Sequence, residues 1–151
     1  MKISSSFVLS PARDDVFAAL VDPGRLRRCI PGCEELTRIG EDAYQARLKI
    51  GVAGLKGSYS GKAELRDKRP PESFTLAFDG KGGPGFVRGV AAIRLTTEPP
   101  ATRVTCEADI QVGGLIAAVG SRLIDATARK LADDFFRQLA LEIDAPAPST
   151  L

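Results

Sequence analysis

The sequence predicts an α+β fold in which a curved antiparallel sheet packs against one long C-terminal helix. Three observations support this fold. The last third of the chain has a helical period, the middle has short period-two segments separated by Gly and Pro, and two short helical segments follow the first strand. A sheet with one solvated face must cover its other face, and a long helix is the simplest cover.

Length and composition fit one globular domain. The chain has 151 residues, of which 44% are hydrophobic and 26% are charged. We expect the domain to span residues 1–143 and a disordered tail to span residues 144–151. The net charge is +2 and the charges are interleaved. The basic cluster at residues 25–28 is typical of a solvated helix face, so nucleic-acid binding is not expected.

The first strand and two short helices come at the start of the chain. Alternating apolar residues predict a strand over residues 3–9. Ser10 and Pro11 then predict a helix start, with serine as N-cap and proline at the first helical position. Residues 22–24, Asp-Pro-Gly, end this helix, and a second short helix is expected over residues 25–29. The inner face of the first helix is formed by Val16, Phe17 and Leu20.

Period-two alternation then continues from Glu34 to Val112. Tight connections divide it into about six strands, which indicates an antiparallel meander. The expected connections are residues 51–57, Pro70-Pro71, a flexible hairpin at residues 80–85, and Pro99-Pro100.

The longest helical pattern runs from about residue 115 to Ile143. Its first turns, residues 115–119, are apolar on every side, so a core, ligand, partner or membrane is expected to cover them. Asp125–Arg129 and Asp133–Arg137 stand at the i,i+4 spacing on the polar side. The inner stripe consists of Ala117, Gly120, Ile124, Ala128, Leu131, Phe135 and Leu139.

Many residues expected between sheet and helix are small. Small residues facing one another leave either a very close helix–sheet contact or a cavity, and a strongly curved sheet favours the cavity. Apolar cavities are the usual form of small-molecule sites. An alanine-rich composition alone would also produce this pattern. The small positions are Ala46, Gly61, Ala63, Gly89, Ala91, Ala108, Ala117, Gly120 and Ala128.

The sequence lacks the residues that several kinds of catalytic site require. The chain has no histidine, which excludes Ser-His and Cys-His nucleophile pairs. Cys29, Cys33 and Cys106 are expected to be free thiols rather than metal ligands, and no metal or cofactor is predicted. Tyr44 and Tyr59 are the clear candidates for polar groups inside a cavity.

Targeting signals are also missing from this sequence. A membrane-spanning helix needs about 20 consecutive apolar residues, and the longest apolar runs here are far shorter. The N-terminal residues lack the apolar core of a signal peptide. We therefore expect a cytoplasmic protein.

Three segments of the chain resemble a known family. They are residues 22–33, which include Pro31-Gly32-Cys33; residues 57–62 with the hairpin up to Gly89; and residues 113–122 with Phe135-Phe136. Together they resemble the G-subunit family of carbon monoxide dehydrogenase, in the START-like helix-grip superfamily, over roughly residues 1–143. The resemblance implies a helix-grip fold with an internal hydrophobic cavity.

The resemblance also implies a function. Members of this family are accessory, non-catalytic proteins beside a molybdenum hydroxylase such as aerobic carbon monoxide dehydrogenase. They are associated with placing that enzyme at the membrane and with electron transfer to quinone. The implied partners are a lipophilic small molecule, for example a quinone, the hydroxylase complex, and the inner face of the cell membrane as a peripheral contact. Some members carry a C-terminal extension that ends in a hydrophobic anchor. We expect no such anchor within the residues up to Leu151.

Two alternatives stay open at this stage. One is a START-like cavity enzyme of the cyclase, dehydratase or hydrolase type, and the other is a protein-only assembly factor. The expected cavity residues are Tyr44, Leu48, Tyr59, Ala63, Phe74, Leu76, Phe78, Ala91, Ile93, Ala108, Ile116, Gly120, Leu123 and Ile124. The residues expected to form a gate or to contact a partner or membrane are Pro31, Gly113, Gly114, Leu115 and Val119.

Overall fold

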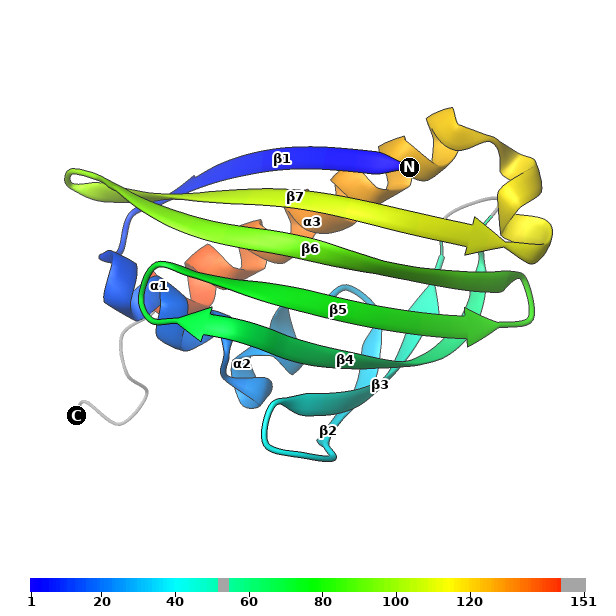
Figure 1. Ribbon diagram of the computed structural model, residues 1–151, viewed down its shortest axis with the longest axis horizontal. Helices are drawn as coiled ribbons and strands as arrows, with labels where there is room; N and C mark the ends of the chain where they lie inside the picture. Colours follow the sequence, from blue (N-terminus) through cyan, green and yellow to red (C-terminus); the bar gives the residue numbers. More distant parts are fainter. Residues whose placement is uncertain (52–54, 145–151) are drawn as a thin grey trace.

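Seven strands form one antiparallel sheet in the computed structural model, which describes residues 1–51 and 55–144 (Figure 1). The strand order is β1-β7-β6-β5-β4-β3-β2, so only β1 leaves the meander, and it pairs with β7. Of the predicted tail, residues 144–151, Asp144 is the last residue of α3, and residues 145–151 lie outside the described residues. Residues 52–54 of the predicted connection lie outside them too. The strands are β1 (Lys2–Leu9), β2 (Cys33–Arg38), β3 (Ala43–Ile50), β4 (Gly57–Arg69), β5 (Ser73–Gly82), β6 (Gly85–Glu98) and β7 (Ala101–Gly113).

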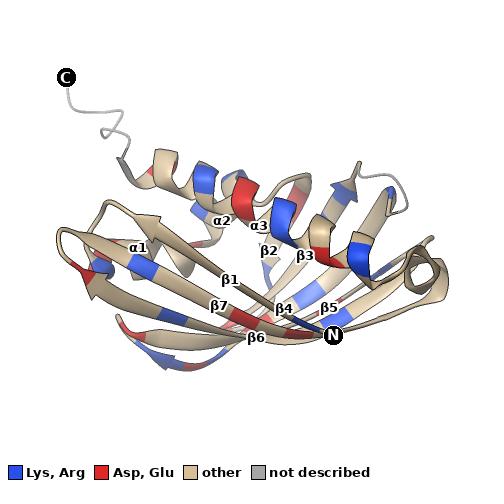
Figure 2. Ribbon diagram, turned by 90° about the horizontal axis from the view of Figure 1, so that it is seen from above, with Lys and Arg blue, Asp and Glu red and all other residues tan. Residues whose placement is uncertain are grey.

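The helices lie on one side of this curved sheet (Figure 2). The close backbone neighbours of the long helix are β1, the two short helices and the 3-10 helix. The predicted fold, a curved antiparallel sheet against a long C-terminal helix, is confirmed. The helices are α1 (Arg13–Leu20), α2 (Pro23–Cys29), the 3-10 helix η1 (Gly114–Val119) and α3 (Ser121–Asp144).

The core between sheet and helices has two parts. The α1 cluster packs α1 and the C-terminal half of α3 onto one end of the sheet, and the η1 cluster fills the other end. The α1 cluster includes Leu9, Val16, Phe17, Leu20, Phe74, Ile93, Leu95, Val104, Phe136 and Leu139. The η1 cluster consists of Ile3, Leu55, Tyr59, Ile110, Ile116 and Ile124. Partly buried Phe78 and Ala108 contact both.

The two short helices begin at different residues from those predicted. Helix α1 starts after Ala12 rather than at Ser10-Pro11, because the Pro11 carbonyl accepts a hydrogen bond from the Thr102 hydroxyl at 2.8 Å and is held by the sheet. Helix α2 starts at Pro23, and its N-cap Asp22 accepts a hydrogen bond from the Gly24 amide at 3.0 Å. Asp22-Pro23 therefore ends one helix and starts the next.

The C-terminal helix is not continuous from residue 115, as the sequence period predicted. Residues 114–119 form η1, and Gly120 separates it from α3 with φ 93° and ψ 151°, a conformation open almost only to glycine. The Gly120 carbonyl then accepts from the Ile124 amide at 3.2 Å, which begins α3. Ala117 and Gly120, predicted to face the sheet, are exposed for this reason.

The glycine-rich hairpin is shorter than predicted. Strands β5 and β6 continue to Gly82 and from Gly85, so only Gly83 and Pro84 turn the chain. A Cβ at Gly82 would lie 2.1 Å from the Ser58 carbonyl oxygen. Glycine is required there because two strands approach closely.

Candidate functional site: the concave face

The strand residues predicted to line a cavity lie together on the concave face of the sheet. Tyr44 is in register with Ala63, and Ala63 is in register with Phe78 on the next strand. The row continues through Gly89 to Ile110. Because alternate residues share a face, the other predicted strand positions lie on the same side. The structure thus brings Leu48, Tyr59, Phe74, Leu76, Ala91, Ile93 and Ala108 onto this face.

These residues differ in how fully they are covered. Phe74 and Ile93 are 6% and 7% exposed and belong to the α1 cluster. The Phe17 ring packs edge-to-face on Phe74, with ring centroids 5.7 Å apart. The predicted cavity residues close to α1 are therefore fully packed core residues. They can form only the inner end of a binding site.

Farther from α1, the concave face stays partly exposed. Leu48, Ala63, Leu76 and Phe78 face inward and yet are only partly buried. Helix α3 has its close backbone contacts with β1 and the other helices and leaves this half of the sheet less covered. Partly exposed apolar side chains on a concave face are the setting in which lipophilic ligands bind.

On the helix side, Ile116 and Ile124 face the sheet and belong to the η1 cluster. Leu123 does not, since it is 37% exposed and belongs to neither core cluster. Gly120 does not border the concave face either, because a Cβ built on it would have nothing within 4 Å. Both positions, predicted to line the cavity, therefore lie away from the concave face.

Thr127 on α3 is a candidate site residue that sequence reasoning missed. It is 5% exposed, and its hydroxyl has no hydrogen-bond partner among the described residues. It lies one helical turn after Ile124 and before Leu131, between the two core clusters. A polar residue three positions after a buried stripe residue was the available signal.

The two tyrosines belong to different core clusters, and the Tyr59 hydroxyl already has a hydrogen-bond partner. Tyr59 donates to the Leu55 carbonyl at 2.6 Å, and burial raises its pKa. Its hydroxyl is thus already engaged in holding the segment before β4. Tyr44 is buried in the α1 cluster.

The residues predicted to form a gate are separated in space. Gly113, Gly114, Leu115 and Val119 lie together around η1, and Leu115 is 73% exposed. Pro31 instead lines a surface pocket with Asp134 and Gln138 of α3. Asp134 lies 13 residues after the first residue of α3, which corresponds to about 20 Å along the helix.

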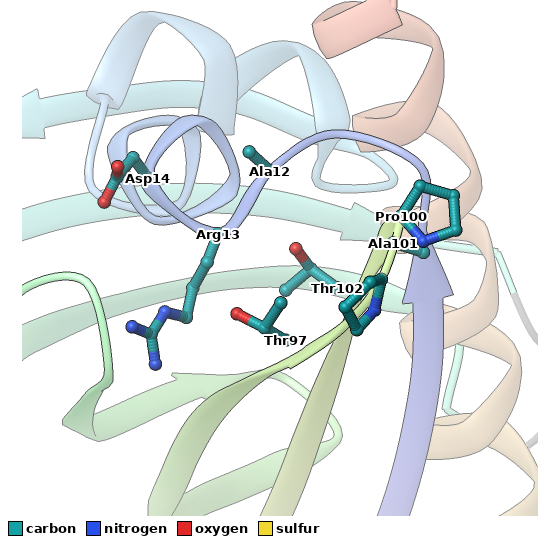
Figure 3. A pocket seen from close by; sticks show the side chains of 8 residues that line it. Ala12, Arg13, Asp14, Thr97, Pro100, Ala101 and Thr102 are labelled. Atoms are coloured by element: carbon teal, nitrogen blue, oxygen red, sulfur yellow. The ribbon is translucent and has the colours of Figure 1, made fainter.

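A second surface pocket, of about 320 Å³, lies at the end of the sheet opposite η1. Figure 3 shows its lining side chains. It is lined by the start of α1 and the turn between β6 and β7, including Arg13, Thr97 and Thr102. None of the predicted cavity residues lines it. Charged Arg13 and Asp14 line it beside alanine and proline residues, so it differs from the apolar concave face.

The three cysteines are free, as predicted. Burial penalises the charged thiolate, and it raises the pKa of Cys29 to about 11. For the same reason the pKa values of Cys33 and Cys106 are also raised. A thiolate is the reactive form of cysteine, so all three side chains are weak nucleophiles near neutral pH.

Comparison with known proteins places this fold in a family. A family model for the carbon monoxide dehydrogenase G-subunit (CoxG) matches residues 6–144. The chain belongs to the CoxG family. No curated protein matches the sequence. The family and the concave face together support a binding or accessory protein.

Solved structures share this fold. A conserved protein from Geobacillus kaustophilus is 39% identical, with 95% of each chain covered and a TM-score of 0.92. A START superfamily protein from Mycobacterium smegmatis is 9% identical, with 95% of this chain and 97% of that chain covered and a TM-score of 0.74. A Chromobacterium violaceum protein is 14% identical, with 96% and 99% covered and a TM-score of 0.73. The last two show the fold alone.

Within residues 1–51 and 55–144, no helix has both the length and the apolarity to cross a bilayer.

Proposed function

We propose that this CoxG-family chain is a non-catalytic accessory protein of a molybdenum hydroxylase. It carries a lipophilic ligand for that enzyme, and the first candidate for this ligand is a quinone. The observation that carries the proposal is the partly exposed apolar half of the concave face. On α3, the buried Thr127 hydroxyl has no hydrogen-bond partner among the described residues. The family supplies the expected enzyme partner, of the carbon monoxide dehydrogenase type. A bound quinone would serve that enzyme's electron transfer or its recruitment to the membrane.

The energetics suit a reversible carrier. A ligand that buries about 400 Å² of apolar surface gains about 10 kcal/mol gross. Association costs about 4–15 kcal/mol in lost freedom, so the net affinity is modest. Leu48, Leu76 and Phe78 offer apolar contact without a charged anchor. Such a site can hold a ligand and release it to a partner.

Thr127 gives this site a preference among apolar ligands. A buried hydroxyl without a partner costs about 1–3 kcal/mol, and a ligand carbonyl that accepts its hydrogen would recover that cost. A quinone has such carbonyl groups, whereas a plain hydrocarbon has none. We therefore expect quinones to bind more tightly than hydrocarbons of equal size.

Ligand binding is tested in two steps. An organic extract of the purified protein is examined by mass spectrometry, and the delipidated protein is titrated with a short-chain quinone and with a hydrocarbon of matched size. We expect a quinone in the extract and tighter binding of the quinone in the titration. Failure of the quinone and of every other lipophilic probe to bind would overturn the carrier role.

The enzyme partner is tested separately. Tagged protein is expected to retain a molybdenum hydroxylase from extracts of its own cells, identified by its molybdenum content and its peptide sequences. If the protein retains no molybdenum enzyme under conditions where the quinone stays bound, the proposed partner is overturned. The proposed carrier role would then still stand.

A further inference from the structure

Helix α2 covers the side of the concave face that lies nearest to β2. The sheet ends at β2, and α3 makes its close backbone contacts with β1 and the other helices. Helix α2 is a close backbone neighbour of both α3 and β2 (Figure 2). It therefore bridges the helix layer and the edge of the sheet on this side.

A surface pocket of about 400 Å³ lies beside this bridge. It is lined by the end of α2, the loop that follows, and Asp134 and Gln138 of α3. Cys33 also lines the pocket and is in register with Leu48, a partly exposed residue of the concave face. Because paired residues of neighbouring strands lie on the same face of a sheet, the pocket adjoins the partly exposed half of the concave face.

Few apolar contacts hold α2 in place. Cys29, at its last position, is 2% exposed and belongs to the α1 cluster. Leu26 is only partly buried and belongs to neither core cluster. A segment with so few buried apolar side chains opens at a lower cost than the rest of a fold.

Two consecutive arginines tie the end of α2 to its neighbours. Arg27 donates to the Glu34 carbonyl of β2 at 3.3 Å, and Arg28 forms an ion pair with Glu142 of α3. Both arginines are exposed, and exposed ties contribute little to stability because water competes for them. They therefore fix the position of α2 and still break readily.

The segments on either side of α2 are suited to act as hinges. Asp22 separates α2 from the helix before it. After α2, the Cys33 amide donates to the Ile30 carbonyl at 3.2 Å, and the Gly32 carbonyl accepts from the Lys49 amide at 2.9 Å. This loop is thus attached to β3, and the helix before it can rotate about the attachment. Hinge motions are absorbed at such ends of elements.

We propose that α2 is a lid over the ligand site. Residues 23–29 swing away from α3, and a lipophilic ligand then passes between α3 and β2 to reach the concave face. Arg27 and Arg28 close the lid again by returning to Glu34 and Glu142. The inference rests on the proposed function, because it needs a ligand that the lid admits.

Alkylation of Cys29 measures the opening without any ligand. The thiol is covered in the closed state, so iodoacetamide reaches it when α2 opens. Glu142→Gln removes the ion pair with Arg28, and we expect alkylation of Cys29 to become about threefold faster, the scale of one exposed ion pair. Peptide mass spectrometry follows Cys29 itself. An unchanged rate would overturn the proposal.

Asp125→Asn is the matched control. It removes another ion pair of α3, in which Asp125 lies 2.8 Å from Arg129, at a position far from α2 along the helix. We expect the Cys29 rate to stay the same in this variant. Equal acceleration by Asp125→Asn and Glu142→Gln would indicate a general loosening of α3 and would overturn the lid.

Stopped-flow mixing of the delipidated protein with a short-chain quinone tests the path. A lid controls entry and exit alike, so Glu142→Gln should raise the association and dissociation rates together, each about threefold, and leave Kd unchanged. Asp125→Asn should change neither rate.

A crosslink between α2 and α3 should have the opposite effect. The variant Arg28→Cys, Glu142→Cys is made in a Cys33→Ser, Cys106→Ser background and bridged with a short bismaleimide. We expect quinone association about tenfold slower than in the same variant treated with a monofunctional maleimide. Equal rates after the two treatments would overturn the proposal.

The outcomes separate this inference from the carrier function. Quinone binding whose rates respond neither to Glu142→Gln nor to the crosslink would overturn the lid and leave the carrier, with exchange past η1 instead. Failure of the quinone and of every other lipophilic probe to bind would overturn both.

Discussion

Replacing Thr127 by valine tests whether its hydroxyl forms a hydrogen bond with a ligand. Valine keeps the branched shape and removes the hydroxyl, which is buried and unpaired among the described residues. In the ligand-free protein the change removes a desolvated polar group, which costs about 1–3 kcal/mol when unsatisfied. We therefore expect the free energy of unfolding to rise by about 1 kcal/mol, since part of that cost is relaxed by side-chain motion.

Ligand affinity should move in the opposite direction. A hydrogen bond to a ligand carbonyl contributes about 1 kcal/mol net, so quinone binding to Thr127→Val is expected to weaken about fivefold. A hydrocarbon of equal size should bind the variant no less tightly. Urea denaturation gives the stability change, and titration of the delipidated protein gives the affinities.

Thr102→Val is the matched control. Thr102 is also buried, with 0% exposure, but its hydroxyl donates to the Pro11 carbonyl at 2.8 Å. The same substitution at Thr102 removes an existing hydrogen bond, so it should lower the free energy of unfolding by about 1–2 kcal/mol. Equal destabilisation by Thr127→Val and Thr102→Val, or unchanged quinone affinity of Thr127→Val, would refute the reasoning about Thr127.

Three other predictions concern the break before α3, the buried thiol and the concave face. Gly120→Ala should cost about 1–3 kcal/mol of stability in urea denaturation although its side chain meets open space, because φ is 93°; Gly83→Ala, also in open space, should be nearly neutral. Cys29, with its pKa raised to about 11, should be alkylated by iodoacetamide more slowly than free cysteine at pH 8, and faster as the pH approaches 11; equal rates at pH 8 would contradict its burial. Ala46→Phe should fill the partly exposed concave face and lower quinone capacity while hydroxylase retention persists, measured by titration and pull-down; unchanged capacity would place the ligand elsewhere.

The fold could be predicted because its signals are local and repeated. Alternation indicated the inward side of each strand, and Gly or Pro marked each connection. The break at Gly120 was missed because its conformation depends on a φ value that a helical period does not encode. Gly120 followed by Ser121 was a usable signal, since serine is common at helix starts.

The candidate site could be predicted only in part. Phe74 and Phe78 lie on the same strand and the same face, and nothing in the local pattern distinguishes them. Phe17 covers Phe74, whereas Phe78 stays partly exposed between the two clusters. Coverage depends on where α1 and α3 pack, which is a long-range property. Thr127 was overlooked because the prediction of the buried stripe considered only apolar and small residues.

The segment between β7 and α3 contributes both to the core and to one end of the concave face. Gly114 and Gly120, with φ values of 76° and 93°, lie at the two ends of η1 and turn it off the path from strand to helix. Within that turn Ile116 enters the core and Leu115 faces outward, while the Ile116 amide fixes η1 to the β5–β6 turn. In a continuous helix these residues would extend the axis of α3 and would not close against Pro84. Two glycine conformations therefore create both the inner wall at this end of the sheet and the apolar projection outside it. Ligand exchange at this end, in place of exchange at α2, would require movement of η1 alone, with α3 remaining packed on β1.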